Sequence, residues 1–247
     1  MVQTDRPASG QGERRSPVSI SVFFPCYNEQ ANVARVAEQA VGVLDELDAD
    51  YEIILVDDGS ADDTGRIADE IAAGNDRIRV IHHERNLGYG AALQSGFRAA
   101  RKELVFYTDG DGQFDIGEMP ALLPLMSDYD IVSCYRIDRQ DNLVRKINGW
   151  LWTRVVGLVF SMRVRDVDCA FKLYRRRLFD EITMESTGAL IDTEILARAI
   201  RKGYTITQKG VHHYPRTAGR QTGANLRVVL RAFQELWRLR RRIAREP

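Results

Sequence analysis

The sequence predicts an α/β protein built on a mostly parallel sheet that is flanked by helices. In the first half, apolar runs of strand length alternate four times with amphipathic segments of helix length. The 247 residues, 44% of them hydrophobic, are enough for one ordinary domain. Polar clusters follow the predicted strands, and ligands of such sheets lie outside the carboxyl ends of the strands. We therefore expect one edge of the sheet to carry the functional site.

The first strand and helix are predicted over 18–24 and 29–47. The strand segment is rich in β-branched and aromatic residues and stops at Pro25, which cannot continue a strand ladder. Asn28 is the expected N-cap of the helix. The apolar residues of this helix recur at helical spacing and are Val33, Val36, Ala40, Val43 and Leu47.

Three further strands are predicted over 51–56, 78–81 and 103–108. Each is short and largely apolar, as expected for parallel strands buried on both faces. The amphipathic segments between them predict helices over 62–73 and 90–100.

The pattern is less regular after Asp115. The expected elements are a strand over 129–135, helices over 142–162 and 195–202, a helix or turn over 178–182, a strand over 204–208, a loop from His212 and a basic helix from Asn225. We expect a disordered tail over 1–16, one globular domain over 17–224 and a basic amphipathic helix over 225–247.

The stretch from Tyr107 to Asp115 is the most informative for chemistry. Asp109 and Asp111 directly follow a predicted strand, and the glycines between them require a sharp turn. Carboxylates that lie so close favour a cation between them. Oxygen ligands from Asp109, Asp111 and Gln113 suit Mg²⁺ or Mn²⁺ and leave positions open for phosphate oxygens. A solvated acidic turn is the alternative.

Two other clusters lie at the same expected edge. Asp57 and Asp58 end the second strand, where a carboxylate can accept hydrogen bonds from a ribose or a base, or can cap the next helix. The loop 86–90 resembles a dinucleotide-binding fingerprint, but it follows the third strand and has Leu93 in place of the last glycine. We therefore reject NAD binding and expect this loop to let backbone approach a ligand, or to be a plain helix start.

Composition excludes several classes of protein. The formal net charge is zero, which argues against nucleic acid as a partner. Cys26, Cys134 and Cys169 are scattered and fit small core residues in a reducing cytoplasm. The tail over 1–16 has no apolar core of a signal peptide, and no run approaches the about 18 apolar residues of a spanning helix.

Five motifs together resemble inverting family-2 glycosyltransferases, in particular polyprenyl-phosphate sugar synthases of the dolichol-phosphate mannose and glucose synthase type. The motifs are Phe24-Pro-Cys-Tyr-Asn-Glu29, Ile54-Leu-Val-Asp-Asp-Gly-Ser60, Asn86-Leu-Gly-Tyr-Gly-Ala91, Asp109-Gly-Asp-Gly-Gln113 and Asp168-Cys-Ala-Phe-Lys-Leu-Tyr-Arg175. The resemblance implies a GT-A fold over 17–224, a nucleotide-sugar donor and Mg²⁺ or Mn²⁺ as cofactor. It departs from many relatives at Ile137-Asp138-Arg139, and in lacking membrane-spanning helices after the domain.

The resemblance also implies roles for individual residues. The expected nucleotide-sugar ligands are Pro25, Tyr27, Glu29, Asp58, Gly88, Asp109 and Gly110, and the expected metal ligands are Asp109, Asp111 and Gln113. The expected catalytic residues are Asp111, Arg136, Lys172 and Glu194. Arg136 would face an acceptor phosphate, and Lys172 would lie near the donor phosphates or the product.

The expected reaction is metal-dependent transfer of a sugar from a UDP or GDP donor to polyprenyl phosphate, at the cytoplasmic face of a membrane. An anionic phosphate acceptor needs cations to position it rather than a strong base. A family-2 transferase acting on a hydroxyl is the alternative, with Glu194 or Asp192 as the base. Nucleotidyl transfer, which would release pyrophosphate, and a non-enzymatic binding module are further alternatives. The sequence identifies neither the sugar nor the oligomeric state.

The C-terminal segment predicts a peripheral contact with the membrane. From Asn225 to Pro247 it holds seven arginines and two glutamates, and its apolar residues recur at helical spacing. A basic amphipathic helix with aromatic residues can lie in an anionic membrane interface, and the helix over 142–162 could share that surface. The alternative is a helix that packs on the domain and leaves a solvated basic face. The apolar residues concerned are Leu226, Val229, Phe233, Leu236 and Trp237.

Overall fold

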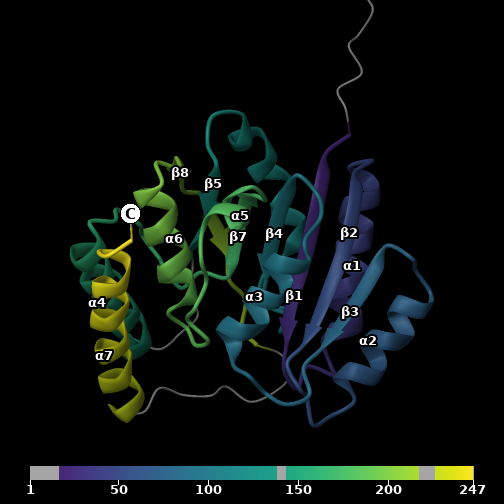
Figure 1. The fold of residues 1–247 in the computed structure, drawn as a ribbon. Coiled ribbons are helices and arrows are strands. Elements are labelled where there is room, and N and C mark those ends of the chain that lie inside the picture. The colour runs from purple at the N-terminus through teal and green to yellow at the C-terminus, as the bar shows by residue number, and fades with distance from the viewer. Residues whose placement is uncertain (1–16, 138–142, 217–225, 247) are drawn as a thin grey trace, which may run out of the picture.

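The computed structural model describes residues 17–137, 143–216 and 226–246. The predicted tail over 1–16 and Arg139 lie outside these ranges. Within them the chain forms an α/β fold with a mixed, mostly parallel sheet between helices, as the sequence predicts (Figure 1).

The main sheet has seven strands in the order β3-β2-β1-β4-β7-β5-β8. The strands are β1 (Ser19–Cys26), β2 (Asp50–Asp57), β3 (Ile78–His82), β4 (Leu104–Thr108), β5 (Ile131–Ser133), β7 (Phe171–Arg175) and β8 (Ile206–Thr207). Strand β7 runs antiparallel to both of its neighbours, β4 and β5, and the other pairs are parallel. A second, two-stranded parallel sheet joins β6 (Tyr135–Ile137) to β9 (Gly210–His212).

Helices cover both faces of the main sheet. They are α1 (Val33–Glu46), α2 (Thr64–Ala73), α3 (Tyr89–Ala99), α4 (Leu143–Phe160), α5 (Leu178–Glu181), α6 (Ile191–Arg201), α7 (Leu226–Ile243) and the 3₁₀ helix η1 (Ile116–Ser127). Helix α1 contacts α2 and η1, whereas α3 contacts α6 on the opposite face. Helices α4 and α7 contact each other beyond α6, at one end of the molecule (Figure 1).

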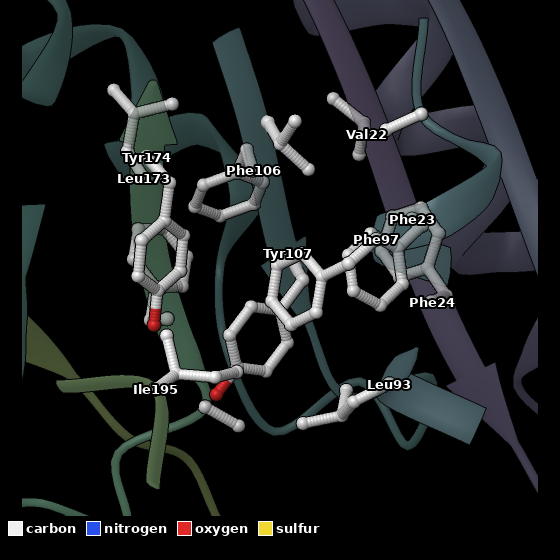
Figure 2. Close-up of a cluster of buried hydrophobic side chains, with 14 of the residues drawn as sticks. Val22, Phe23, Phe24, Leu93, Phe97, Phe106, Tyr107, Leu173, Tyr174 and Ile195 are labelled. Atoms are coloured by element: carbon white, nitrogen blue, oxygen red, sulfur yellow. The ribbon is translucent and has the colours of Figure 1, made fainter. Parts of the chain in front are cut away.

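An aromatic cluster joins the two halves of the chain in the core (Figure 2). The ring of Phe23 in β1 lies 4.8 Å from Phe97 in α3 and 5.4 Å from Tyr107 in β4. Tyr174 in β7 lies 5.5 Å from Phe97. All four side chains are buried, and aromatic pairs at these distances add packing energy beyond their buried area. The cluster therefore fixes β7 against the parallel strands of the first half.

The start of α1 differs from the prediction. The helix begins at Val33 rather than near Glu29, and Asn28 does not cap it. Asn28 has a φ of 56°, and its side-chain oxygen accepts a hydrogen bond from the backbone N–H of Ala61 at 2.8 Å. The asparagine thus joins the loop after β1 to the loop after β2 instead of starting the helix.

The second half differs more. The predicted strand over 129–135 is divided at Cys134 between two sheets, and the loop predicted from His212 begins one residue later because His212 ends β9. Strand β7 was not predicted, and η1 replaces an irregular segment that contains two prolines. Helix α6 begins at Ile191 rather than Ile195, so Asp192 and Glu194 lie in its first turn.

The described part of α7 packs on the domain. Leu236, Leu239 and Ile243 are buried, whereas Trp237 is 57% exposed. The side chains of Leu226, Val229 and Phe233 lie outside the described residues. The apolar stripe of the last three turns is therefore used by the fold and does not face a membrane. Among the described residues, none of the helices combines the length and hydropathy needed to cross a bilayer.

Candidate active site

The acidic turn after β4 lies against the end of β1. The backbone N–H of Gly110 donates to the carbonyl of Pro25 at 3.3 Å. A Cβ atom on Gly110 would lie 2.6 Å from the Sγ atom of Cys26, so a side chain does not fit there. Gly112 has a φ of 69°, which glycine adopts readily. These two glycines allow the tight turn that places Asp109 and Asp111 close together at the C-terminal end of β4.

The two carboxylates create an unfavourable negative charge. Burial, and then repulsion from Asp111, raise the pKa of Asp109. Burial also raises the pKa of Asp111. The Oδ1 atom of Asp109 is buried and accepts no hydrogen bond from the described residues. A divalent cation would satisfy that oxygen and neutralise the pair, so the two carboxylates fit the expected cofactor.

The aspartates would have to share the cation with other ligands. No group of three His, Cys, Asp or Glu side chains within the described ranges could hold a metal ion. Gln113 donates its backbone N–H to Asp111 at 3.0 Å, and its side-chain amide donates to the carbonyl of Tyr214 at 2.9 Å. The side-chain amide is thus held toward the loop after β9. Phosphate oxygens and water are the natural remaining ligands for Mg²⁺ or Mn²⁺.

Arg216 also lies at this site, although no pattern in the sequence distinguishes it. Its guanidinium forms an ion pair with Glu29, and its Nη1 atom lies 4.0 Å from Oδ2 of Asp111. Glu29 is 7% exposed and also accepts a hydrogen bond from Asn32. Burial raises the pKa of Glu29, and its bonds to Asn32 and Arg216 oppose that effect. Arg216 lies in a loop, where neither hydrophobic periodicity nor motif spacing predicts which residues contact the site.

Asp58 lies at the expected edge, but its carboxylate is occupied within the protein. One oxygen lies 2.6 Å from Nδ1 of His83 and accepts the N–H of Leu87, and the other accepts the N–H of Gly88 at 2.9 Å. Nε2 of His83 lies 2.9 Å from the hydroxyl of Ser95. Asp58 therefore holds the loop before α3 in place.

Gly88 is required by this loop. It has a φ of 100°, and a Cβ atom there would lie 2.6 Å from the carbonyl oxygen of Thr187. The N–H of Gly90 donates to the same oxygen at 2.9 Å. The close approach expected of this loop is thus made to protein backbone. A cavity of about 590 Å³ lies beside it, and Gly88, Trp152, Asp168 and Arg238 are among its lining residues.

Lys172 lies beneath the site rather than in it. Because β7 is antiparallel, its first residues lie at the edge where β4 ends, and Lys172 pairs with Tyr107 in the sheet. The fully buried ammonium group donates to Asp192 at 2.7 Å, to the carbonyl of Cys169 at 2.6 Å and to the hydroxyl of Tyr107 at 3.1 Å. These bonds use all three of its protons, so Lys172 has none left for a phosphate.

Arg136 and Asp168 lie near this network. The guanidinium of Arg136 donates two hydrogen bonds to Asp166, at 2.7 and 2.8 Å. Burial, and then repulsion from Asp192 and Asp166, raise the pKa of Asp168 to about 7. Asp168 belongs to the fifth sequence motif, but only its place in the cavity beside Gly88 distinguishes it as a candidate site residue.

Of the two remaining predicted site residues, Glu194 is buried and Tyr27 is exposed. Glu194 is fully buried, binds Arg198 at 3.0 Å and accepts the N–H of Ser186 at 2.7 Å. This glutamate supports the segment that packs on Gly88 and does not line the cavity beside it. Tyr27 is 46% exposed, at the loop that follows β1.

Sequence comparison identifies relatives of the chain. It is 33% identical over 221 residues to glycosyltransferase AglD of Haloferax volcanii, covering 85% of this chain and 35% of that protein. It is 34% identical to an undecaprenyl-phosphate 4-deoxy-4-formamido-L-arabinose transferase of Aeromonas hydrophila, covering 65% and 50% of the two chains. It is 28% identical to a dodecaprenyl-phosphate galacturonate synthase of Rhizobium johnstonii, covering 74% and 56%. The chain thus spans less than two thirds of each of these relatives.

The fold is similar to that of solved glycosyltransferase structures. Glucosyl-3-phosphoglycerate synthase from Mycobacterium tuberculosis, in complex with UDP, matches with a TM-score of 0.67 at 20% identity, covering 93% of this chain and 81% of that one. The same enzyme in complex with Mn²⁺, UDP-glucose and phosphoglyceric acid matches with a TM-score of 0.63. The family model "Glycosyl transferase family 2" matches residues 21–183. The chain therefore belongs to glycosyltransferase family 2, as its five motifs predict.

Proposed function

We propose that this protein transfers a sugar, with inversion, from a nucleotide sugar to polyprenyl phosphate at the cytoplasmic face of a membrane. The main observation behind the proposal is the buried pair Asp109 and Asp111 at the carboxyl edge of the sheet. A divalent cation would neutralise the negative charge of this pair. The names of two of the relatives contain undecaprenyl-phosphate and dodecaprenyl-phosphate, which supports this acceptor. UDP and Mn²⁺ in the similar solved structures support the donor class and the cofactor.

The donor would bind with its diphosphate over the acidic turn. Bound there, Mg²⁺ or Mn²⁺ supplies compensation for the negative charge that the leaving diphosphate gains as the sugar–phosphate bond breaks. Arg216 already lies between Glu29 and Asp111 and can donate to a phosphate oxygen beside them. Pro25, Tyr27 and the loop held by Asp58 would enclose the nucleoside.

The acceptor phosphate would meet Arg136. A guanidinium has five N–H groups, and the pair with Asp166 uses two of them. The remaining N–H groups can donate to an acceptor phosphate, while Asp166 fixes the plane of the guanidinium. Such an acceptor is already anionic, so orientation by cations replaces a strong base.

A hydroxyl acceptor is the second candidate, and one observation favours it. Asp168 lines the cavity beside Gly88 and has a pKa raised to about 7, which suits a general base near neutral pH. Glu194 and Asp192, the two bases suggested by the sequence, are instead bound to Arg198 and Lys172. Extraction of radiolabelled product into organic solvent after incubation with labelled donor separates lipid-linked from water-soluble products.

Binding of nucleoside diphosphates tests the donor site directly. We expect UDP or GDP to raise the melting temperature more with Mn²⁺ than with a chelator, because Asp109 and Asp111 would hold the cation and its charge would favour a bound diphosphate. Asp111→Ala should remove this difference and abolish transfer. Asp115→Ala, a nearby exposed carboxylate whose side chain accepts the N–H of Gly117, is the matched control. Full transfer by the wild type in excess chelator would overturn metal dependence.

A further inference from the structure

Helix α4 presents large apolar side chains to solvent. Leu158 is 83% exposed, Trp150 56% and Leu151 48%. Trp150 and Leu151 precede Leu158 by eight and seven residues, which places all three on the same side of the helix, two turns apart. Several large apolar side chains exposed on one side of a helix are uncommon on soluble proteins and mark interaction surfaces.

A groove runs along this side of α4. Its cavity has a volume of about 910 Å³, larger than the 590 Å³ of the cavity beside Gly88. Gln208 fixes the opposite wall, because its side chain donates to the carbonyl of Arg163 at 3.0 Å and accepts the N–H of Arg165 at 2.7 Å. One side of the groove is therefore fixed by hydrogen bonds between the Gln208 side chain and the backbone of Arg163 and Arg165, and the other side is helix α4.

The groove combines apolar and cationic side chains. Arg154, Arg163 and Arg165 line it together with Trp150, Leu158, Met162 and Val164, and none of the described lining residues is acidic. The guanidinium of Arg154 lies 5.2 Å from the Trp150 ring, and that of Arg165 lies 4.6 Å from the Tyr135 ring. Apolar and aromatic side chains flanked by arginines are complementary to a bilayer interface. There the lipid phosphates accept hydrogen bonds from the arginines, and the acyl chains contact the apolar side chains.

The position of the groove suits the reaction. Arg165 directly precedes Asp166, the residue that holds Arg136. Trp152 extends from α4 to the cavity shared by Gly88 and Asp168. Helix α4 therefore contributes side chains both to the groove and to the cavity beside Gly88.

We propose that this α4 groove, rather than the buried apolar side of the last three turns of α7, binds the anionic phospholipid surface of a membrane. The inference rests on the proposed function in one respect, namely that a polyprenyl acceptor is held in a bilayer. The lipid phosphates contact Arg154, Arg163 and Arg165. The side chains of Leu158 and Trp150 enter the interfacial region between the headgroups and the acyl chains. The last three turns of α7 do not compete for this role, because Leu236, Leu239 and Ile243 are buried against the domain.

Flotation with unilamellar vesicles tests the groove. The full chain should float with vesicles of phosphatidylcholine that contain phosphatidylglycerol, should float much less with pure phosphatidylcholine, and should be released by salt. Leu158→Glu should lower the partition coefficient about tenfold or more, since insertion of one leucine is lost. Arg163→Ser and Arg165→Ser should each lower it about fivefold. Ile200→Glu on α6 and Arg66→Ser on α2 alter exposed residues outside the groove and should change nothing.

Three outcomes would overturn the inference. These are equal flotation of Leu158→Glu and wild type, equal binding to neutral and anionic vesicles, and no binding of the full chain to either. Melting curves of each variant exclude unfolding as the cause of lost flotation, and capture of a soluble protein by the groove without vesicle binding would assign it to a protein partner.

Failure of the proposed function gives a different result. Vesicle binding that depends on the groove, with no Mn²⁺-dependent binding of UDP or GDP, would leave the membrane contact standing without the transferase assignment. The Leu158→Glu variant can also lose vesicle binding and still transfer sugar to polyprenyl phosphate in detergent. That result would support the transferase function and the membrane contact of the groove independently.

Discussion

Asp58 stabilises a loop and lies at the expected nucleotide pocket, and these two roles can be measured apart. Asp58→Ala leaves the N–H groups of Leu87 and Gly88 without their acceptor. We expect the free energy of unfolding to fall by about 1–3 kcal/mol and nucleoside diphosphate binding to weaken by a similar amount. Urea unfolding measures the first effect and calorimetry the second.

A matched control separates Asp58 from its neighbours. Asp69→Ala removes an exposed partner of His82 and should change stability by less than about 1 kcal/mol. If Asp58→Ala lowers stability as expected but leaves the calorimetric affinity for nucleoside diphosphate unchanged, Asp58 has a structural role only.

Asp168 should make stability depend on pH. Its carboxyl stays protonated in the folded protein up to about pH 7, whereas the unfolded chain releases that proton near the ordinary value of 3.8. Since the unfolded state then binds fewer protons, rising pH between these values favours unfolding. Asp168→Asn should therefore raise the free energy of unfolding by a margin that grows from pH 4 to pH 7 and then levels off. We expect a final margin of about 1–2 kcal/mol, because partial exposure weakens the effect.

Urea unfolding at pH 4 to 8 with chelator present measures this margin. Asp128→Asn, at an exposed position after η1, is the control. A margin that stays constant over this pH range would show that Asp168 does not retain its proton in the folded protein.

At the scale of elements, the loop before α3 depends on one glycine. Gly88→Ala places a Cβ atom 2.6 Å from the carbonyl oxygen of Thr187 in a backbone conformation with a φ of 100°. We expect this change to lower the free energy of unfolding by about 1–3 kcal/mol. Gly42→Ala in α1 meets no atom within 4 Å and should stabilise the protein by up to about 1 kcal/mol. Equal effects of the two variants in urea would contradict this account of the loop.

The first four strands could be predicted within two residues at each end. They are short apolar runs that alternate with amphipathic helices, and this local pattern is sufficient to identify them. Strand β7 escaped prediction because its place between β4 and β5 depends on pairing with segments distant in the sequence. The start of α6 was misplaced because Asp192 and Glu194 resemble exposed residues of a helix N-terminus. Both are buried, and their partners, Lys172 and Arg198, cannot be read from the sequence.

The site shows the same division between local and distant information. The acidic turn could be predicted because its carboxylates are adjacent in the sequence. Arg216 could not, since it reaches Glu29 and Asp111 from a loop more than a hundred residues away. Lys172 could be placed near the site by its motif, but its burial follows only from the antiparallel direction of β7.

At the scale of the whole molecule, α7 is part of the folded domain. Leu236→Ser removes a fully buried side chain and should lower the free energy of unfolding by about 2–4 kcal/mol. Trp237→Ser, at the adjacent exposed position, should change it by less than about 1 kcal/mol. Deletion of 226–247 should lower the melting temperature further, because Arg198 also loses its bond to Glu246. A deleted protein that melts like the full chain would show that α7 is dispensable for the domain.

The antiparallel strand β7 has a consequence for the order in which the protein is made. Strands β1 to β4 can pair as soon as they leave the ribosome, but the free edge of β4 must wait for β7. Roughly 60 residues separate them, which at about 5–20 residues per second is a delay of several seconds. During that time β4 exposes unpaired backbone groups, and β5 has no strand to join, because β7 lies between it and β4. Nascent chains halted before Phe171 should therefore be the species most prone to aggregate and most dependent on chaperones.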